Sequence, residues 1–363
     1  MDIPIFRFQS SELESVAMRV VHRIVRSGRF ILGNEVDHFE NSFAEYLGVK
    51  HCVTVGNGTD ALQLALQAVG VGFGDLVLTV ANAGCYSTAA IRSLGAQPLY
   101  VDVKGDSLLF DASLIDDHAL KDAKALIATH LYGQIVDIEI IAVLCHKYGI
   151  PLIEDCAQSH GAMLGGCYAG SFGDIGCFSF YPTKNLGGIG DGGALVTDSD
   201  DIAYRVRQLR QYGWDQKYHV VVAGGRNSRL DEIQAGYLRE VLPNLNDSNS
   251  RRIEIAEYYN DRFKDLPLMS PKIDGKRHVV HQYVLQVADR DDFRNYLSEA
   301  GVMTEIHYPI PDNHQMAYPE SAKPSLPVTE LACSRVVSLP CFPCLSESEC
   351  KYVANTVCSY FDR

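Results

Sequence analysis

Residues 178–187 read Phe-Ser-Phe-Tyr-Pro-Thr-Lys-Asn-Leu-Gly, and their lysine, Lys184, is followed by five glycines between positions 187 and 193. Glycines let a backbone approach a flat ligand closely. A lysine loses its charge readily when it is desolvated or placed near another cation, and the neutral amine condenses with an aldehyde. The segment therefore predicts the Schiff-base lysine of a pyridoxal phosphate site. The alternative role for a lysine among glycines is a solvated loop residue.

A strand-end carboxylate upstream supplies the second group that such a site needs. Asp155 ends the apolar run 150–154, and ligands in open α/β sheets bind just beyond the carboxyl ends of strands. A carboxylate there keeps a pyridinium nitrogen protonated, so that the ring accepts electrons. Gln158 and His160 follow and offer hydrogen bonds near the ring. The alternative for such an aspartate is a helix cap.

A glycine turn supplies the third group, a phosphate site. Residues 52–55 predict a strand, residues 56–60 a tight turn, and residues 61–69 a helix rich in alanine and leucine. Free N–H groups and the positive end of the helix dipole attract a phosphate at such a terminus. Gly58 and Thr59 are therefore the main predicted phosphate contacts.

The phosphate turn, the aspartate and the lysine occur in this order along one alternating α/β pattern. On these residues the chain resembles fold-type I pyridoxal enzymes and, among them, the DegT/DnrJ/EryC1/StrS family of nucleotide-sugar aminotransferases. The matching motifs cover nearly the whole chain, at residues 57–62, 130–134, 154–158, 179–187, 190–194 and 227–232. The resemblance implies an α/β large domain with a mostly parallel sheet and a smaller α+β C-terminal domain.

The resemblance also implies roles around the cofactor ring. Lys184 forms the internal Schiff base, Asp155 pairs with the pyridinium nitrogen, and Gln158 reaches the ring hydroxyl. An aromatic residue covers the ring, at Cys85 or Tyr86 depending on the alignment. Tyr86 is favoured because an aromatic side chain can stack on a pyridine face, although an ordinary packed tyrosine is the alternative.

The phosphate contacts implied by the resemblance join two subunits. Gly58, Thr59 and Ser179 hold the phosphate from one chain. Asn227 reaches it from the neighbouring subunit, so a homodimer with shared active sites is expected.

The expected reaction is transamination, because relatives with histidine at the position of Lys184 dehydrate sugars instead. An amino acid such as L-glutamate would donate the amine, and a nucleotide-linked keto-sugar would accept it. The expected substrate-facing residues are Tyr218 and His219 in one segment and His307 and Tyr308 in another. Residues 307–311, followed by His314 and Gln315, resemble members that aminate carbon 3 of dTDP-linked 6-deoxyhexoses.

Three alternatives remain open. Asp312 and Asn313 stand where many carbon-3 members have Pro and His, so amination at carbon 4 of a 4-keto-sugar is the first alternative. A non-catalytic regulator is the second, although it would need neither Lys184 nor Asp155. An α-amino-acid aminotransferase is the third and would need an arginine for the substrate carboxylate, for which Arg277 and Arg335 are the candidates.

The composition agrees with an enzyme of the cytoplasm. The chain has 363 residues, a net charge of −13, and no long apolar span or signal peptide, which argues against nucleic acid and membrane partners. Its 11 cysteines show no framework spacing, so reduced thiols are expected. The pair Cys341 and Cys344 has no second pair at ligand spacing, and His307 has no partner at helical spacing. No metal site is expected.

Two domains are expected, at residues 1–245 and 246–363. Strands of the large domain are expected at residues 52–55, 76–80, 97–101, 125–129, 151–154, 176–180 and 194–197. A long helical region at residues 231–263, interrupted near Pro243, bridges the domains. In the small domain, strands at residues 281–287 and after Gly301 flank a helix at 291–300. A turn at residues 338–340 closes it.

Overall fold

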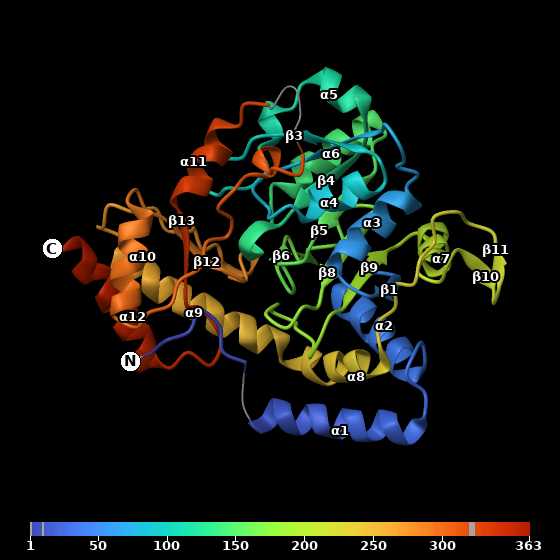
Figure 1. The fold of residues 1–363 in the computed structure, drawn as a ribbon, viewed down its shortest axis with the longest axis horizontal. Coiled ribbons are helices and arrows are strands. Elements are labelled where there is room, and N and C mark those ends of the chain that lie inside the picture. The colour runs from blue at the N-terminus through green and yellow to red at the C-terminus, as the bar shows by residue number, and fades with distance from the viewer. Residues whose placement is uncertain (1, 9–10, 319–323) are drawn as a thin grey trace.

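A computed structural model of the chain describes residues 2–8, 11–318 and 324–363 (Figure 1). Its centre is a seven-stranded sheet. In the order in which they lie side by side, the strands are β1 (His51–Val55), β9 (Gly193–Thr197), β8 (Ile175–Ser179), β5 (Leu152–Asp155), β4 (Ala123–Thr129), β2 (Leu76–Thr79) and β3 (Gln97–Tyr100). Strand β9 runs antiparallel to both neighbours, and the other neighbouring pairs are parallel. The predicted strands and the mostly parallel sheet are confirmed.

Helices cover both faces of this sheet, because its strands are apolar on both sides. In β4, Ala125 and Ile127 pack in one core with residues of α3, α4 and α7, whereas Leu126 and Ala128 pack in another with residues of α2, α6 and α8. Strand residues alternate between the faces with a period of two. The helices are α1 (Ser11–Ser27), α2 (Asn34–Leu47), α3 (Gly58–Ala68), α4 (Tyr86–Ser93), α5 (Asp117–Asp122), α6 (Ile138–Tyr148), α7 (Asp200–Leu209), α8 (Glu232–Val241), α9 (Leu245–Phe263), α10 (Arg290–Glu299), α11 (Pro327–Arg335) and α12 (Glu347–Phe361).

The shorter elements complete the chain. Short 3-10 helices lie at Ala112–Leu114, Leu131–Gly133, Leu242–Asn244, Gly275–Arg277 and Asp312–His314. Three two-stranded sheets pair β6 (Met163–Leu164) with β7 (Cys167–Tyr168), β10 (Trp214–Gln216) with β11 (His219–Val220), and β12 (Tyr283–Gln286) with β13 (Val336–Leu339). The predicted break at Pro243 is confirmed, because a 3-10 turn separates α8 from α9.

A second apolar core lies at the C-terminal end of the chain. Residues of α9, α10 and α12 pack there against β12 and β13, with Ile3 from the N-terminal segment among them. Both termini lie at this side of the molecule, and α9 crosses from it toward the central sheet (Figure 1). The domain boundary at 245/246 stays a prediction.

Two expectations about the small domain were wrong. Ser338 and Leu339 belong to strand β13, not to a turn, because they pair with Val284 and Tyr283. The segment after Gly301 forms only isolated bridges, at Val302 and Glu305, instead of a strand. Among the described residues, no helix is long and apolar enough to cross a bilayer.

Candidate active site

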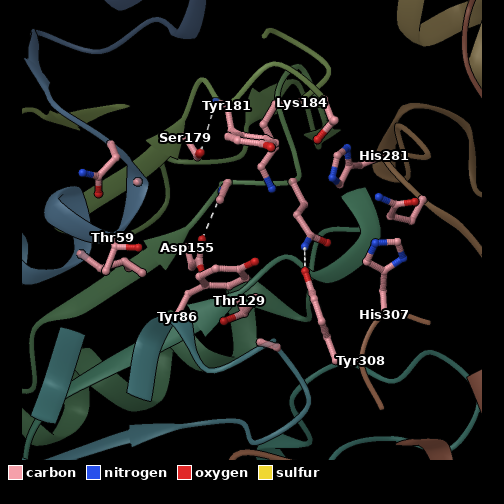
Figure 2. Close-up of a pocket in the computed structure, with 18 of the residues that line it drawn as sticks. Thr59, Tyr86, Thr129, Asp155, Ser179, Tyr181, Lys184, His281, His307 and Tyr308 are labelled. Carbon is pink, nitrogen blue, oxygen red and sulfur yellow. Dashed lines mark hydrogen bonds between the residues drawn. The ribbon is translucent and has the colours of Figure 1, made fainter. Parts of the chain in front are cut away.

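A cavity of about 610 Å³ opens beyond the carboxyl ends of β4, β5 and β8 (Figure 2). Its lining residues are far apart in the sequence, from Asn57 before α3 to residues 305–308. The predicted site residues that line it are Gly58, Thr59, Tyr86, Asp155, Gln158, Ser179, Lys184, His307 and Tyr308. Cys85, the alternative stacking residue, does not line it, whereas Tyr86 does.

Lys184 follows strand β8 and points into this cavity (Figure 2). A turn fixes its backbone, because its N–H donates to the carbonyl of Tyr181 at 2.9 Å. Burial lowers the pKa of Lys184 to about 8, although the carboxylate of Asp155 acts in the opposite direction. A larger fraction of the amine is therefore neutral near pH 7 than in a solvated lysine.

Asp155 is the last residue of β5 and is buried. Burial raises the pKa of its carboxyl group, whereas the N–H of Ala157, which donates to Oδ1 at 3.1 Å, and the nearby Lys184 lower it. A buried carboxylate is costly unless a cation pairs with it. A cationic ring nitrogen in the cavity would supply such a partner.

The phosphate turn is formed by the start of α3 and the strand before it. Helix α3 begins at Gly58, three residues earlier than predicted, because the side chain of Asn57 accepts a hydrogen bond from the N–H of Asp60 at 2.8 Å. A Cβ on Gly58 would lie 2.6 Å from the Cβ of Ser179. Only glycine therefore lets the free N–H groups of the first turn approach the Ser179 hydroxyl, which makes a compact cradle for an anion.

The opposite wall carries Tyr308 and Gln158, whose hydrogen bonds have a fixed direction. Gln158 Oε1 accepts from the N–H of Tyr132 at 2.6 Å, so its Nε2 donates to the Tyr308 hydroxyl at 3.1 Å. The Tyr308 hydroxyl can then donate its own proton, and it interacts with the hydroxyl of Tyr86. Tyr86 packs against Tyr308 in an edge-to-face geometry with ring centroids 6.2 Å apart.

Asp312 links this wall to helix α4. It was not identified as a functional residue from the sequence. Its carboxylate accepts from the N–H of Cys85 at 2.9 Å and from the hydroxyl of Thr88 at 2.6 Å, and no side chain of α4's own N-cap makes a capping bond. Asp312 thereby caps the helix that begins at Tyr86. The sequence signalled this residue only as a departure from the family pattern.

Of the predicted residues, the buried His160 does not line the cavity, and three exposed ones lie outside it. Tyr218 and His219 are in the exposed β10–β11 hairpin, which projects from the molecule beyond α7 (Figure 1). His219 Nδ1 lies 2.7 Å from the carboxylate of Asp215. Asn227 is exposed and forms an isolated bridge with Gln211. Within one chain these residues are not brought to Lys184.

The two arginines considered for an α-carboxylate also lie elsewhere. Arg277 forms an ion pair with Asp137 at 2.6 Å, and Arg335 is exposed. Among the described residues that line the cavity there is no arginine. The cavity of a single chain therefore lacks the carboxylate fork of an α-amino-acid aminotransferase.

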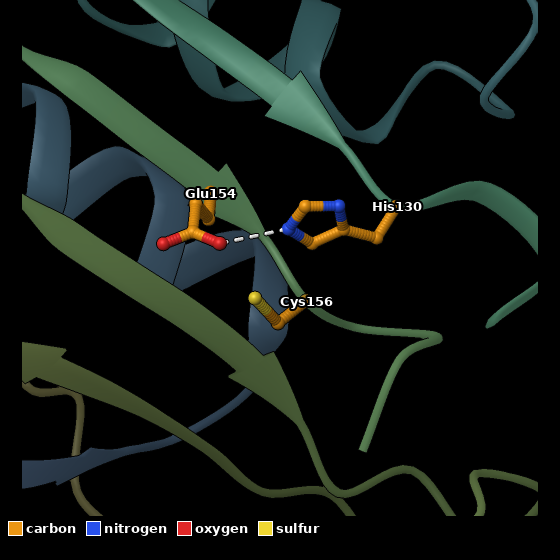
Figure 3. Close-up of side chains that lie close together, drawn as sticks. All are labelled: His130, Glu154 and Cys156. Atoms are coloured by element: carbon orange, nitrogen blue, oxygen red, sulfur yellow. Dashed lines mark hydrogen bonds and ion pairs between the residues drawn. The ribbon is translucent and has the colours of Figure 1, made fainter. Parts of the chain in front are cut away.

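His130, Glu154 and Cys156 lie close together in the interior (Figure 3). The carboxylate of Glu154 already accepts hydrogen bonds from three backbone N–H groups, those of residues 170, 172 and 173, and lies 2.9 Å from His130 Nε2. Burial raises the pKa of the Cys156 thiol. Glu154 therefore fixes the loop after β7 through these hydrogen bonds, and its oxygens are not free to bind a metal.

Comparisons with known proteins agree with this geometry. The model of the DegT/DnrJ/EryC1/StrS aminotransferase family matches residues 12–358. The chain belongs to this family. It is 43% identical to a dTDP-3-amino-3,6-dideoxy-α-D-galactopyranose transaminase of Aneurinibacillus thermoaerophilus, over 94% of each chain. It is 41% identical to a dTDP-3-amino-3,4,6-trideoxy-α-D-glucose transaminase of Micromonospora megalomicea, over 90% of this chain and 89% of that one.

Solved structures of aminotransferases have the same fold. The structure of S. venezuelae DesV in complex with a ketimine intermediate superposes with a TM-score of 0.93 at 36% identity and covers 99% of this chain and 100% of that one. NtdA from Bacillus subtilis, with bound PMP, has a TM-score of 0.91 at 28% identity and covers 99% and 84%. The predicted fold class, family and enzyme class are confirmed.

The aminotransferase uses pyridoxal phosphate, the cofactor of its family. The residues of the cavity fit this group, because they combine a lysine of lowered pKa, a buried strand-end carboxylate and an N-terminal helix cradle. When bound, pyridoxal phosphate supplies an electron sink for carbanion chemistry. Lys184 would hold it covalently, Asp155 would hold its ring nitrogen, and Gly58, Thr59 and Ser179 would hold its phosphate.

Proposed function

We propose that this enzyme transfers an amino group from an amino acid, L-glutamate, to carbon 3 of a dTDP-linked 3-keto-6-deoxyhexose. The observation that carries the proposal is the cavity that unites Lys184 and Asp155 with residues 305–308. The names of the two relatives at 43% and 41% identity support a dTDP-linked sugar and carbon 3.

In this proposal the side chains of the cavity have three roles: proton transfer, orientation of the sugar, and stabilisation of the cofactor's charge. Lys184, whose amine is neutral more often than that of a solvated lysine, takes and returns the proton at the reacting carbon. His307 and Tyr308 orient the sugar, so that its carbonyl comes within about 3–3.5 Å of the amine to be transferred. Asp155 keeps the cofactor nitrogen charged.

We also propose a cytoplasmic homodimer in which each active site takes residues from both chains. Tyr218, His219 and Asn227 would reach the partner's cavity, which agrees with their exposure away from their own. Apolar side chains exposed on α1, Met18 at 65% and Val25 at 58%, offer a surface that a partner could bury. All 11 cysteines are free, as expected in a reducing compartment.

Product analysis tests the function directly. The purified enzyme is supplied with L-glutamate and with dTDP-linked 3-keto- or 4-keto-6-deoxyhexose, and the product is examined by NMR. We expect an amine on carbon 3 from the 3-keto-sugar and little turnover of the 4-keto-sugar. An amine on carbon 4 would instead establish the carbon-4 alternative, and turnover of neither sugar would favour a non-catalytic regulator.

A further inference from the structure

His281 lines the active-site cavity beside Lys184 and is buried, and the reaction as described above gives it no role (Figure 2). Its backbone is held firmly, because the buried guanidinium of Arg252 contacts its carbonyl at 3.5 Å and the N–H of the next residue donates to the carbonyl of Tyr132 at 3.2 Å. The imidazole is therefore presented to the cavity from a fixed position.

Two buried amides determine which nitrogen of His281 carries a proton. Asn249 Nδ2 donates to the backbone carbonyl of His160 at 2.8 Å, so Asn249 Oδ1 must be the acceptor that faces Asn185. Asn185 Nδ2 donates to that oxygen at 2.8 Å and to the carbonyl of Val279 at 3.0 Å. Because carbonyl oxygens only accept, the orientation of both amides follows from these contacts.

This orientation turns Asn185 Oδ1 toward His281 Nδ1, at 3.1 Å. An amide oxygen accepts only, so Nδ1 carries the proton and donates. Burial, together with the positive charge of Lys184, lowers the pKa of His281 well below its usual range. The ring is therefore neutral at physiological pH, and Nε2 carries a lone pair.

Nε2 of His281 has no hydrogen-bond partner among the residues that the structure describes. It is accessible from the cavity, because it is not one of the fully buried polar atoms that lack a partner. An acceptor in this position selects a ligand group that can donate. The diphosphate of a nucleotide sugar and the carboxylates of an amino acid carry no proton near pH 7, and the amino group of the amino acid is the group that reacts at the cofactor. A pyranose hydroxyl does, and a buried acceptor left without a partner would disfavour a sugar that lacks it.

We propose that His281 is a specificity-determining residue whose Nε2 accepts a hydrogen bond from a hydroxyl group of the keto-sugar. The proposal rests on the sugar aminotransferase function proposed above. Asn185 and Asn249 are positioning residues in it, because they hold the Nε2-unprotonated tautomer.

A matched pair of variants tests it. His278 is as buried as His281 and also bonds through Nδ1, which accepts from the N–H of Val280 at 3.1 Å, but it does not line the cavity. His281→Phe keeps a ring of similar size and removes Nε2, and His278→Phe makes the same change outside the cavity. Steady-state kinetics give KM for the keto-sugar and for glutamate. Calorimetry gives Kd for the dTDP-amino-sugar product and for dTDP alone.

We expect His281→Phe to raise KM for the keto-sugar and Kd for the amino-sugar product about tenfold, the effect of one lost hydrogen bond to a buried acceptor. Affinity for dTDP, KM for glutamate and all values of His278→Phe should stay unchanged. Unchanged sugar KM and Kd in His281→Phe, or an effect on glutamate instead, would overturn the proposal. If the wild type aminates no keto-sugar, the proposed function fails and this inference fails with it.

Nitrogen-15 NMR of the wild-type protein gives a test that does not depend on the folding of a variant. We expect the Nε2 resonance of His281 to have the shift of an unprotonated nitrogen and to move when the dTDP-amino-sugar binds, but not when dTDP binds. A protonated Nε2, or a resonance that does not respond to the sugar, would overturn the proposal.

Discussion

The cavity around Lys184 and the β10–β11 hairpin differ in how their polar side chains are held. In the cavity, Gln158 is fixed by a backbone N–H and itself fixes Tyr308. In the hairpin, Tyr218 is 78% exposed. Among the described residues, its ring contacts only Trp214 and Lys217, which belong to the same hairpin. The cavity is therefore organised within one chain, whereas most side chains of the hairpin stay exposed to solvent.

The largest expected effect on activity comes from substituting Asp155 in the cavity. Asp155→Ala should lower the rate of amine transfer by about 10²–10³-fold or more, because it removes the charge that we expect to hold the cofactor nitrogen in its protonated form. Asp155→Asn keeps the shape without the charge and should lose nearly as much. Rates of amino-sugar formation measure both. Wild-type activity in Asp155→Ala would show that another carboxylate has this role.

The next prediction concerns Asn227, which is exposed and lies outside the cavity of its own chain. Asn227→Ala should weaken cofactor binding, because its amide is expected to reach the phosphate in the partner's cavity. In heterodimers of Lys184→Ala and Asn227→Ala chains, one site would combine the wild-type lysine of one chain with the wild-type asparagine of the other. We expect these heterodimers to recover about half of the wild-type activity per dimer, as independent sites imply.

Homodimers of each variant are the controls for this experiment. Correctly assembled heterodimers without activity would place Asn227 in the same site as the Lys184 of its own chain. The exposure of Asn227 outside its own cavity would then not indicate an active site shared between two chains.

A smaller effect is expected at the substrate wall of the cavity. His307→Ala should reduce keto-sugar turnover about fivefold, the effect of about 1 kcal/mol from one lost hydrogen bond. The half-reaction with glutamate should stay nearly intact, because His307 is expected to orient only the sugar. Single-turnover measurements with each substrate separate the two. Equal losses in both half-reactions would assign His307 a general structural role.

The sequence predicted those parts of the fold and site that depend on local patterns. The apolar run that ends at Asp155 identifies a buried strand, and the carboxyl ends of neighbouring parallel strands meet at one edge of the sheet. The start of α3 was missed by three residues, because the cap provided by Asn57 depends on one side-chain bond.

Contacts between distant segments could not be predicted in this way. Asp312 contacts Cys85 across 227 positions, and His281 contacts Asn185 across 96. Nothing in the local sequence signals either pair, because both form only when the C-terminal segment packs against the sheet. Ser338 and Leu339 were misread as part of a turn for the same reason, since their pairing with β12 places them in strand β13.

The last prediction concerns the free energy of unfolding rather than activity, at the residue that caps α4. Burial raises the pKa of Asp312 to about 7, so the native state binds a proton that the unfolded chain releases near pH 4. The contribution of this group to the free energy of unfolding is therefore complete below about pH 4 and is lost as the pH rises through about 7. Asp312→Asn cannot ionise, so its gain in stability relative to the wild type should grow from about 1 kcal/mol near pH 5 to about 4 kcal/mol above pH 7. Thermal unfolding measures this, and a difference independent of pH would contradict it.

The most direct test of the account is to identify the lysine that binds the cofactor. The purified protein, loaded with pyridoxal phosphate, is reduced with borohydride, digested and examined by mass spectrometry. We expect loss of the visible Schiff-base band and one pyridoxyl adduct, on the peptide that carries Lys184, with neither band nor adduct in Lys184→Ala. An adduct on a different lysine of the wild type, or an unchanged Schiff-base band in Lys184→Ala, would contradict it.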